Sequence, residues 1–230
     1  MNLLEGLLWY LVFLFSTVFH EASHAFAAWR LGDNTGYQGG QVTLDPMPHI
    51  RREPIGLVVV PILSFLFGGM LMGWASAPYN AYWARAFPKR AAIMSLAGPT
   101  ANLILVGLSV LLMWLGSVLK IFSPPSIGYL NYSHVIETVP GSYFSIVATL
   151  LSITFSLNII LFLFNLLPIP PLDGSGVIPA FLGRRQAVQY MDWVQQPTAQ
   201  MIGLILCWHL FPSLFQPVYI FFLKVLYGLI

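Results

Sequence analysis

Charge is nearly absent from long stretches of this 230-residue sequence, and this constrains its fold more than any other feature. Only 8% of the residues are Asp, Glu, Lys or Arg, and 57% are hydrophobic. Soluble domains carry about 25% charged residues. A chain this poor in charge cannot cover a globular surface with polar groups, and its apolar runs are long enough to cross a bilayer as helices. We therefore expect an all-α, multi-pass integral membrane protein.

The apolar runs predict the individual membrane segments. Residues 55–77 contain a proline and a glycine pair, which favours a re-entrant or paired short-helix hairpin over a single crossing. Residues 201–229 contain two prolines and predict one kinked span or a short hairpin. Three runs are uninterrupted and predict one spanning helix each: residues 3–29, 91–119 and 143–167.

The remaining sequence predicts one membrane-embedded domain over residues 1–230, with a core at about 3–180 and a C-terminal membrane segment at about 201–229. No linker, repeat or charged tail interrupts it. Residues 37–44 have the pattern of a short hairpin or edge strand, and residues 168–197 that of a loop. The single cysteine, Cys207, excludes an internal disulfide and is expected to be a buried, inert thiol.

The basic residues indicate the orientation of the chain. If residues 55–77 return to the side from which they leave, eight of the ten Lys and Arg residues fall on one side of the membrane. By the positive-inside rule this side is cytoplasmic, and the membrane is expected to be the cell membrane. The formal net charge of +2 includes no dense basic patch, so we expect no nucleic-acid partner. The eight residues are Arg30, Arg51, Arg52, Arg85, Lys89, Arg90, Arg184 and Arg185.

A metal-binding pattern lies inside the first apolar run, where the sequence reads His20-Glu21-Ala22-Ser23-His24. Residues four apart share one face of a helix, so both histidines can reach one metal ion. Glu21 lies beside them and can hold a water molecule against that metal. A polar cluster lining a membrane cavity is the simpler alternative.

Catalytic zinc sites use three protein ligands, so a third His, Asp or Glu is required at membrane depth. Apart from Glu21, all other acidic residues but one lie at span ends or in loops away from the motif. The exception is Asp173, which follows the third span in Pro168-Ile169-Pro170-Pro171-Leu172-Asp173-Gly174. The prolines end the helix and Gly174 permits a tight turn, although an aspartate before glycine is also common in plain loops.

Charge neutralisation supports this cluster. An isolated Asp at the centre of a membrane helix costs about 2.5–3.5 kcal/mol on insertion scales. A zinc ion carries a charge of +2, and ionised Glu21 and Asp173 together carry −2. With neutral histidines the site is therefore neutral, and bound metal removes most of the penalty that each carboxylate incurs alone.

These segments together resemble the site-2 protease family, the intramembrane zinc metalloproteases of peptidase family M50. The resemblance rests on the His-Glu-x-x-His helix, on Ala97-Gly98-Pro99-Thr100-Ala101-Asn102 and on Asn165…Leu172-Asp173-Gly174, in that order. It covers roughly residues 15–178, and the chain is similar to the minimal form without a PDZ or CBS domain. The resemblance implies one Zn²⁺ held by His20, His24 and Asp173, Glu21 as general base, and cleavage of membrane-spanning helices near the cytoplasmic side.

Two amides in apolar helices are candidates for a role beside the metal. Asn102 and Asn165 each need a polar partner. Either could donate a hydrogen bond to the oxyanion or hold the substrate backbone. For Asn102, a hydrogen bond between helices is an equally good interpretation, whereas Asn158 is expected to be structural. An exposed strand edge within residues 37–44 could capture an unwound substrate by strand addition.

The partners expected on this hypothesis are a transmembrane protein substrate and the lipid bilayer. The sequence does not decide whether a regulatory membrane protein or a second copy of the chain is also a partner. The alternative function is a non-enzymatic metal-binding or transport protein, but transport needs polar residues along a path through the bilayer. Among the other histidines, His49 is expected in a surface loop rather than as a gate or regulatory ligand, and His134 and His209 at surfaces or interfaces.

Overall fold

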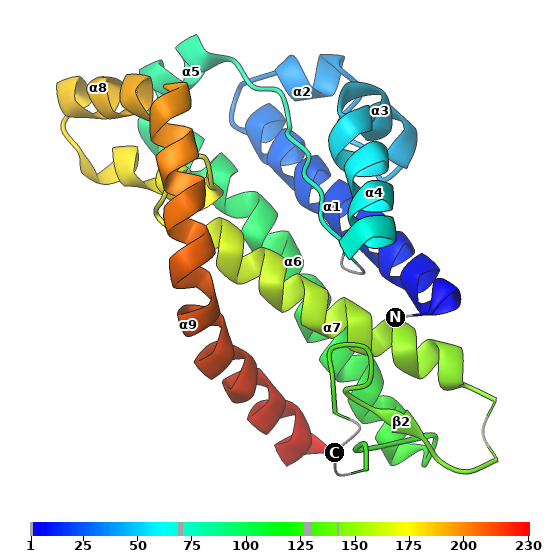
Figure 1. The fold of residues 1–230 in the computed structure, drawn as a ribbon. Helices are drawn as coiled ribbons and strands as arrows, with labels where there is room; N and C mark the ends of the chain where they lie inside the picture. Colours follow the sequence, from blue (N-terminus) through cyan, green and yellow to red (C-terminus); the bar gives the residue numbers. More distant parts are fainter. Residues whose placement is uncertain (1, 69–70, 127–129, 142) are drawn as a thin grey trace.

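Four long helices form the body of the protein in a computed structural model that describes residues 2–68, 71–126, 130–141 and 143–230. All four are long and apolar enough to cross a membrane (Figure 1). This confirms the expected all-α, multi-pass class. The helices are α1 (Leu3–Arg30), α6 (Pro88–Val118), α7 (Ser145–Leu166) and α9 (Pro197–Leu229).

The four helices run alternately up and down, and α6 and α7 lie side by side between α1 and α9 (Figure 1). Helix α9 is continuous through Pro212 and Pro217, so the C-terminal segment is a single span rather than a hairpin. Cys207 lies on this helix and is a buried free thiol, as expected. Most of α9 is nevertheless exposed, which suits a helix that faces lipid on most sides.

Two apolar clusters hold the bundle together. The first joins α6, α7 and α9 through buried Met113, Phe155, Ile159 and Tyr219. The second joins the N-terminal half of α1 to α7. Glycine allows the closest approach: a Cβ atom on Gly203 of α9 would lie 1.8 Å from the carbonyl oxygen of Pro170. Helix α9 therefore packs directly on the turn that precedes Asp173.

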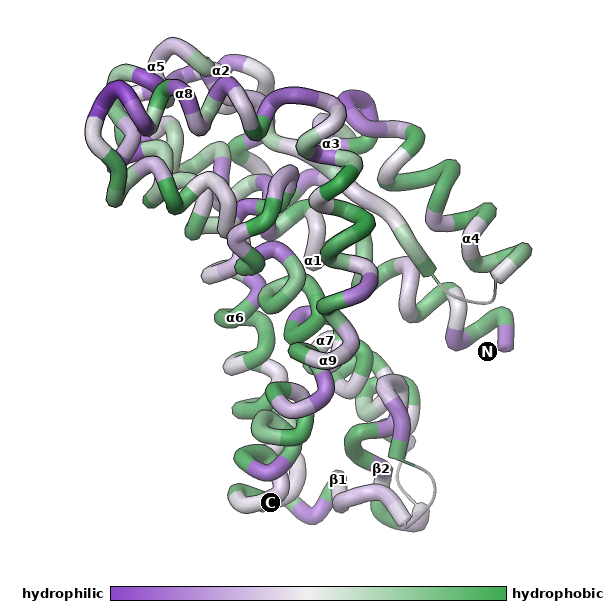
Figure 2. The backbone as a smooth tube through the Cα atoms, turned by 60° about the vertical axis from the view of Figure 1, so that its left-hand side comes forward, coloured by the Kyte–Doolittle hydropathy of each residue, from purple (hydrophilic) through white to green (hydrophobic). Residues whose placement is uncertain are grey.

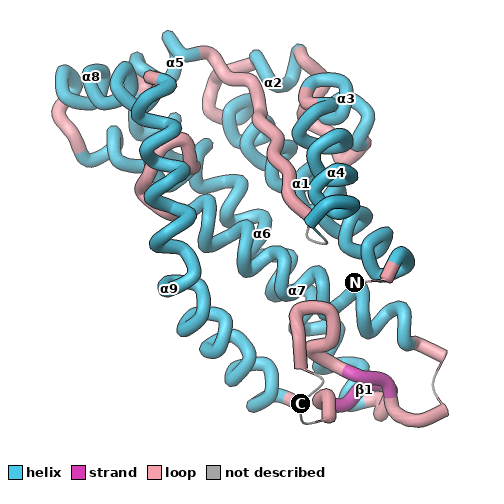
Figure 3. Tube along the Cα trace, viewed as in Figure 1, coloured by secondary structure: helices cyan, strands magenta, loops and turns pink. Residues whose placement is uncertain are grey.

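Residues 55–68 and 71–80 are the two arms of a hairpin, as the sequence predicts for residues 55–77. A π-helical turn (η1, Ile55–Val59) continues into α4 (Val60–Gly68), and the chain then returns in extended form beside it (Figure 3). The amide of Trp74 donates to the carbonyl of Gly56 at 3.1 Å, which fixes the return path. Gly69, the second residue of the predicted glycine pair, lies outside the described residues.

Short helices gather at one end of the bundle, where many residues are hydrophilic (Figures 1 and 2). The eight basic residues named above lie on these helices or at the adjoining ends of α1 and α6. The structure therefore has the charge asymmetry that the sequence predicts. An ion pair between Arg85 and Asp192 (2.6 Å) joins two of them. The helices are α2 (Thr35–Gln38), α3 (Pro46–Arg52), α5 (Ala81–Ala86) and α8 (Arg184–Val194).

Two local predictions were wrong. Residues 37–44 form no strand in the described structure: α2 ends at Gln38, and Asp45 caps α3 by accepting a hydrogen bond from the Met47 amide. Gly40 has φ +69°, and no described strand lies alongside to pair with this segment. Residues 168–197 are also not a plain loop, because they include the 3₁₀ helix η2 (Asp173–Phe181) and α8.

The opposite end of the molecule is closed by a small antiparallel sheet of β1 (Phe122–Ser123) and β2 (Glu137–Thr138), which lies beside the C-terminus in Figure 1. Ser133 in this region accepts a hydrogen bond from the Trp9 indole at 3.0 Å and donates to Glu5. These contacts tie the start of α1 to the loop between α6 and α7.

Candidate metal centre

Helix α1 places the histidine motif on its buried side. His20, Glu21 and His24 are all buried, and the two imidazole rings meet edge to face at 4.7 Å between centroids. His20 precedes the end of the helix at Arg30 by ten residues. At a rise of about 1.5 Å per residue it lies roughly 15 Å along the helix from that end. The motif is therefore inside the apolar span and not at its surface.

Asp173 reaches the same point from the other half of the chain. Helix α7 ends at Leu166, and the chain turns back through Pro170 and Pro171 before η2 begins at Asp173. A Cβ atom on Gly174 would lie 2.2 Å from the carbonyl oxygen of Leu166. The turn is thus packed against the end of α7 on one side and against α9 on the other, and this holds the carboxylate in place.

Three electron-rich atoms converge where these segments meet. The Nε2 atoms of His20 and His24 lie 3.0 Å apart, and the Asp173 carboxylate oxygen lies 3.0 Å from the first and 3.2 Å from the second. Four ligands at about 2.0 Å from a zinc ion lie about 3.3 Å from one another. The three atoms therefore have nearly the spacing of three corners of a tetrahedral site.

Hydrogen bonds on the far side of each ring determine which nitrogen faces the cluster. His20 Nδ1 contacts the Asn102 side-chain oxygen at 2.5 Å, and His24 Nδ1 contacts the Met94 carbonyl oxygen at 2.7 Å. Both partners are acceptors, so the neutral rings carry their protons on Nδ1 and direct the Nε2 lone pairs at Asp173. A divalent cation between the two lone pairs and the carboxylate would bind all three, and the residues present therefore fit a zinc ion.

Asn102 is fully buried, and its contacts favour the structural alternative raised above. Its side-chain nitrogen donates to the Asn158 side-chain oxygen at 2.8 Å, while its oxygen accepts from His20. Asn158 in turn donates to Ser16 and to the Thr154 carbonyl. Asn102 therefore orients a histidine of the site, and both its side-chain oxygen and its side-chain nitrogen bind buried partners.

Asn165 and Glu21 have fewer contacts. Asn165 lies half-buried in the last turn of α7 and donates to the Leu161 carbonyl of its own helix at 3.0 Å. Its proposed contact with substrate stays a prediction. Within the described part of the chain, no group forms a hydrogen bond with the carboxylate of buried Glu21, which leaves it available to a water molecule or a substrate.

Gly98 of α6 is a site residue to which the sequence assigned no role. A Cβ atom built on it would lie 2.3 Å from His24 Nε2 and 2.4 Å from His20 Nε2. The backbone of α6 therefore covers the site at a distance that only glycine permits. The signal was present in Ala97-Gly98-Pro99, but a glycine inside a helical pattern does not by itself show what it faces.

The prediction for His49 was wrong. The residue is 2% exposed, and its Nε2 contacts the Thr43 carbonyl oxygen at 3.1 Å. It folds the segment after α2 onto α3 and belongs to no metal cluster found in the described residues. His209 is exposed on α9 and His134 half-buried, as expected for residues at surfaces.

Comparison with known proteins agrees with the geometry. The sequence model of peptidase family M50 matches residues 8–210. Two relatives carry the words zinc metalloprotease in their names. YwhC of Bacillus subtilis is 31% identical over 164 residues, covering 71% of this chain and 64% of the relative. Rip2 of Mycolicibacterium smegmatis is 31% identical over 169 residues, covering 74% and 55%. The match thus spans less than two thirds of either relative, and no solved structure matches.

Replacing Gly98 with alanine should lower zinc affinity by about tenfold or more, because the new methyl group overlaps the two ligand nitrogens. The measurement is zinc content of purified protein after competition with a chelator. Gly107→Ala is the matched control, since Gly107 lies on the same helix with nothing within 4 Å of an added Cβ. Equal zinc retention by the two variants would contradict the close packing of α6 on the site.

Replacing Asn102 with leucine should weaken zinc binding by about 10- to 100-fold, because His20 loses the acceptor that holds its tautomer. Asn102→Asp keeps an acceptor oxygen and should retain more zinc than Asn102→Leu in the same competition. A direct oxyanion role predicts a different result, in which both variants keep a normal zinc content and lose only activity.

Proposed function

Because this chain belongs to peptidase family M50, we propose that it is an intramembrane zinc metalloprotease of the site-2 type, which hydrolyses peptide bonds within or near transmembrane segments of other proteins. The observation that carries the proposal is the convergence of His20, His24 and Asp173 inside a spanning helix bundle, with Glu21 beside them.

The roles of the residues follow from their contacts. His20, His24 and Asp173 would hold one zinc ion. Bound zinc supplies Lewis-acid chemistry, which polarises a carbonyl and makes water more acidic. Asn102 and the Met94 carbonyl keep both imidazole rings in the tautomer that binds metal. Gly98 leaves space for the ion between α1 and α6.

Glu21 acts as the general base. Its carboxylate is buried next to the histidines and has no hydrogen-bond partner among the described residues. It takes a proton from the attacking water as the water oxygen bonds to the scissile carbonyl carbon. It then gives this proton to the leaving amine as the carbon–nitrogen bond breaks. A carboxylate in this position serves both steps because it is regenerated at the end.

The depth of the site supports a membrane-embedded substrate. The two histidine ligands lie within an apolar span, closer to the end that carries Arg30 than to the N-terminus. A substrate helix must unwind locally at that depth, since its peptide bonds are shielded by their own hydrogen bonds. With the basic end in the cytoplasm, cleavage takes place on the cytoplasmic side of the cell membrane.

The alternative, a non-enzymatic metal-binding or transport protein, needs a path of polar groups through the bilayer. The one candidate metal cluster in the described residues lies at a single depth. A transport function also gives Glu21 no specific task.

Replacing Glu21 with glutamine should leave zinc content unchanged and reduce cleavage of a model transmembrane substrate by about 10²- to 10⁴-fold, the usual effect of losing a general base. Asp173→Ala should lower zinc content as well as activity. The assay compares purified variants reconstituted with the same substrate and uses Glu137→Gln, at the opposite end of the molecule, as the control.

The outcomes separate the two functions. A Glu21→Gln variant that still cleaves would disprove the proposed base. Wild-type protein that binds zinc in the predicted site but cleaves no transmembrane substrate would favour the binding or transport alternative.

A further inference from the structure

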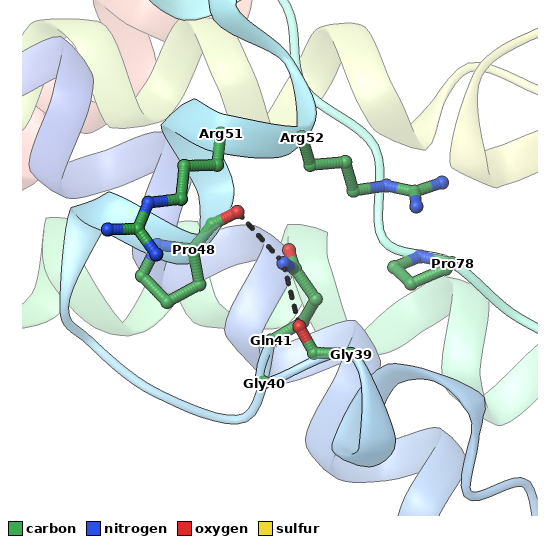
Figure 4. A pocket seen from close by; sticks show the side chains of 7 residues that line it. All are labelled: Gly39, Gly40, Gln41, Pro48, Arg51, Arg52 and Pro78. Carbon is green, nitrogen blue, oxygen red and sulfur yellow. Dashed lines mark hydrogen bonds between the residues drawn. The ribbon is translucent and has the colours of Figure 1, made fainter.

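A cavity lies at the basic end of the molecule, and none of the three candidate metal ligands lines it. It has a volume of about 590 Å³ and is formed between the turn after α2, the end of α3 and the extended return of the hairpin (Figure 4). The residues around it are Gly39, Gly40, Gln41, Pro48, Arg51, Arg52 and Pro78.

Two arginine side chains flank the cavity from opposite sides (Figure 4). Arg51 makes no hydrogen bond or ion pair with any described residue. Arg52 uses its Nε to donate to the Ser76 carbonyl oxygen at 3.1 Å, which leaves its terminal nitrogens unpaired in the described structure. The acidic side chain beside them, Glu53, accepts a hydrogen bond from Ser76. The cavity thus presents guanidinium donors without a matching anion of its own.

The side chain of Gln41 contributes an acceptor. Gln41 is 3% exposed, and its nitrogen donates to the Pro48 carbonyl at 3.1 Å and to the Gly39 carbonyl at 3.4 Å. These bonds fix the amide orientation and turn Oε1 toward the space between the arginines (Figure 4). This oxygen is buried and has no partner among the described residues. An unpaired buried acceptor costs free energy until a donor occupies the site.

The position of the cavity in the fold restricts the ligand. Arg51 and Arg52 end α3, and the chain enters the apolar hairpin three residues later at Ile55. The cavity is therefore at the depth where spans meet the polar surface, which is where lipid phosphates lie. Arginine forms bidentate hydrogen bonds with phosphate oxygens.

We propose that this cavity binds a phospholipid whose headgroup has an N–H or O–H donor. Examples are the ammonium group of phosphatidylethanolamine and the glycerol of phosphatidylglycerol. The phosphate lies between Arg51 and Arg52, and the headgroup donor bonds to Gln41 Oε1. One phosphodiester with an attached donor satisfies both halves of the cavity at once. The site concerns lipid binding, so it does not depend on the proposed protease activity.

The arginines can be tested by measuring lipid retained on the purified full-length chain in detergent by native mass spectrometry. Added phosphatidylglycerol should bind the Arg51→Gln/Arg52→Gln variant about tenfold more weakly than wild type. The matched control is Arg184→Gln/Arg185→Gln, which removes two adjacent exposed arginines from the same end of the molecule but not from the cavity. Arg51→Gln alone removes no internal contact and keeps the test valid if the double variant is unstable. Unchanged zinc content confirms that each variant is folded.

Gln41 is tested by selectivity. Wild type should prefer phosphatidylglycerol and phosphatidylethanolamine to phosphatidylcholine, whose quaternary ammonium has no N–H donor. Gln41→Leu should lose this preference while still binding through the arginines.

An equal loss of phosphatidylglycerol binding in the two double-arginine variants would overturn the proposal, because it would show only a general effect of surface charge. Competition by millimolar inorganic phosphate as effective as that by lipid would also overturn it, by assigning the cavity to a soluble anion. Displacement of lipid by a peptide from a cleaved substrate would assign it to substrate binding instead.

Discussion

The structure depends on one electrostatic requirement: two imidazole lone pairs and a carboxylate meet within 3.2 Å in the interior of a membrane bundle. Without a cation these groups repel each other and remain desolvated, which is unfavourable at low dielectric. With a doubly charged ion, Asp173 and Glu21 become neutralised rather than isolated charges. The polar groups around the site have the same purpose, because they hold the rings in the orientation that a metal requires.

The architecture brings together two segments that are far apart in sequence. Helix α1 supplies the histidines, and the end of α7 supplies Asp173 through a turn packed on α9. Helix α6 lies between them, and its Gly98 gives the space that any side chain would fill. Backbone that leaves helical form at membrane depth is tolerated where protein surrounds it, and here the surrounding helices provide that cover.

Much of this arrangement could be predicted from the sequence. The long apolar runs predicted the spans, and the scarcity of acidic residues left Asp173 as the partner for His20 and His24. The predictions that were wrong concern features that depend on tertiary contacts. The segment 37–44 has strand-like residues but no described neighbour to pair with, and His49 is buried because the segment after α2 packs against it at Thr43. The alternative roles of Asn102 could only be distinguished once its partners, His20 and Asn158, were visible.

The central claim is that Asp173 and the two histidines hold one zinc ion, and X-ray absorption at the zinc edge tests it most directly. Wild-type protein should show about four nitrogen or oxygen ligands at roughly 2.0–2.1 Å and no sulfur. Asp173→Cys should place one sulfur at about 2.3 Å in that shell. The native thiol, Cys207, is buried on α9 and lies in no metal cluster found in the described residues. A ligand shell without sulfur in zinc-loaded Asp173→Cys protein would contradict the account.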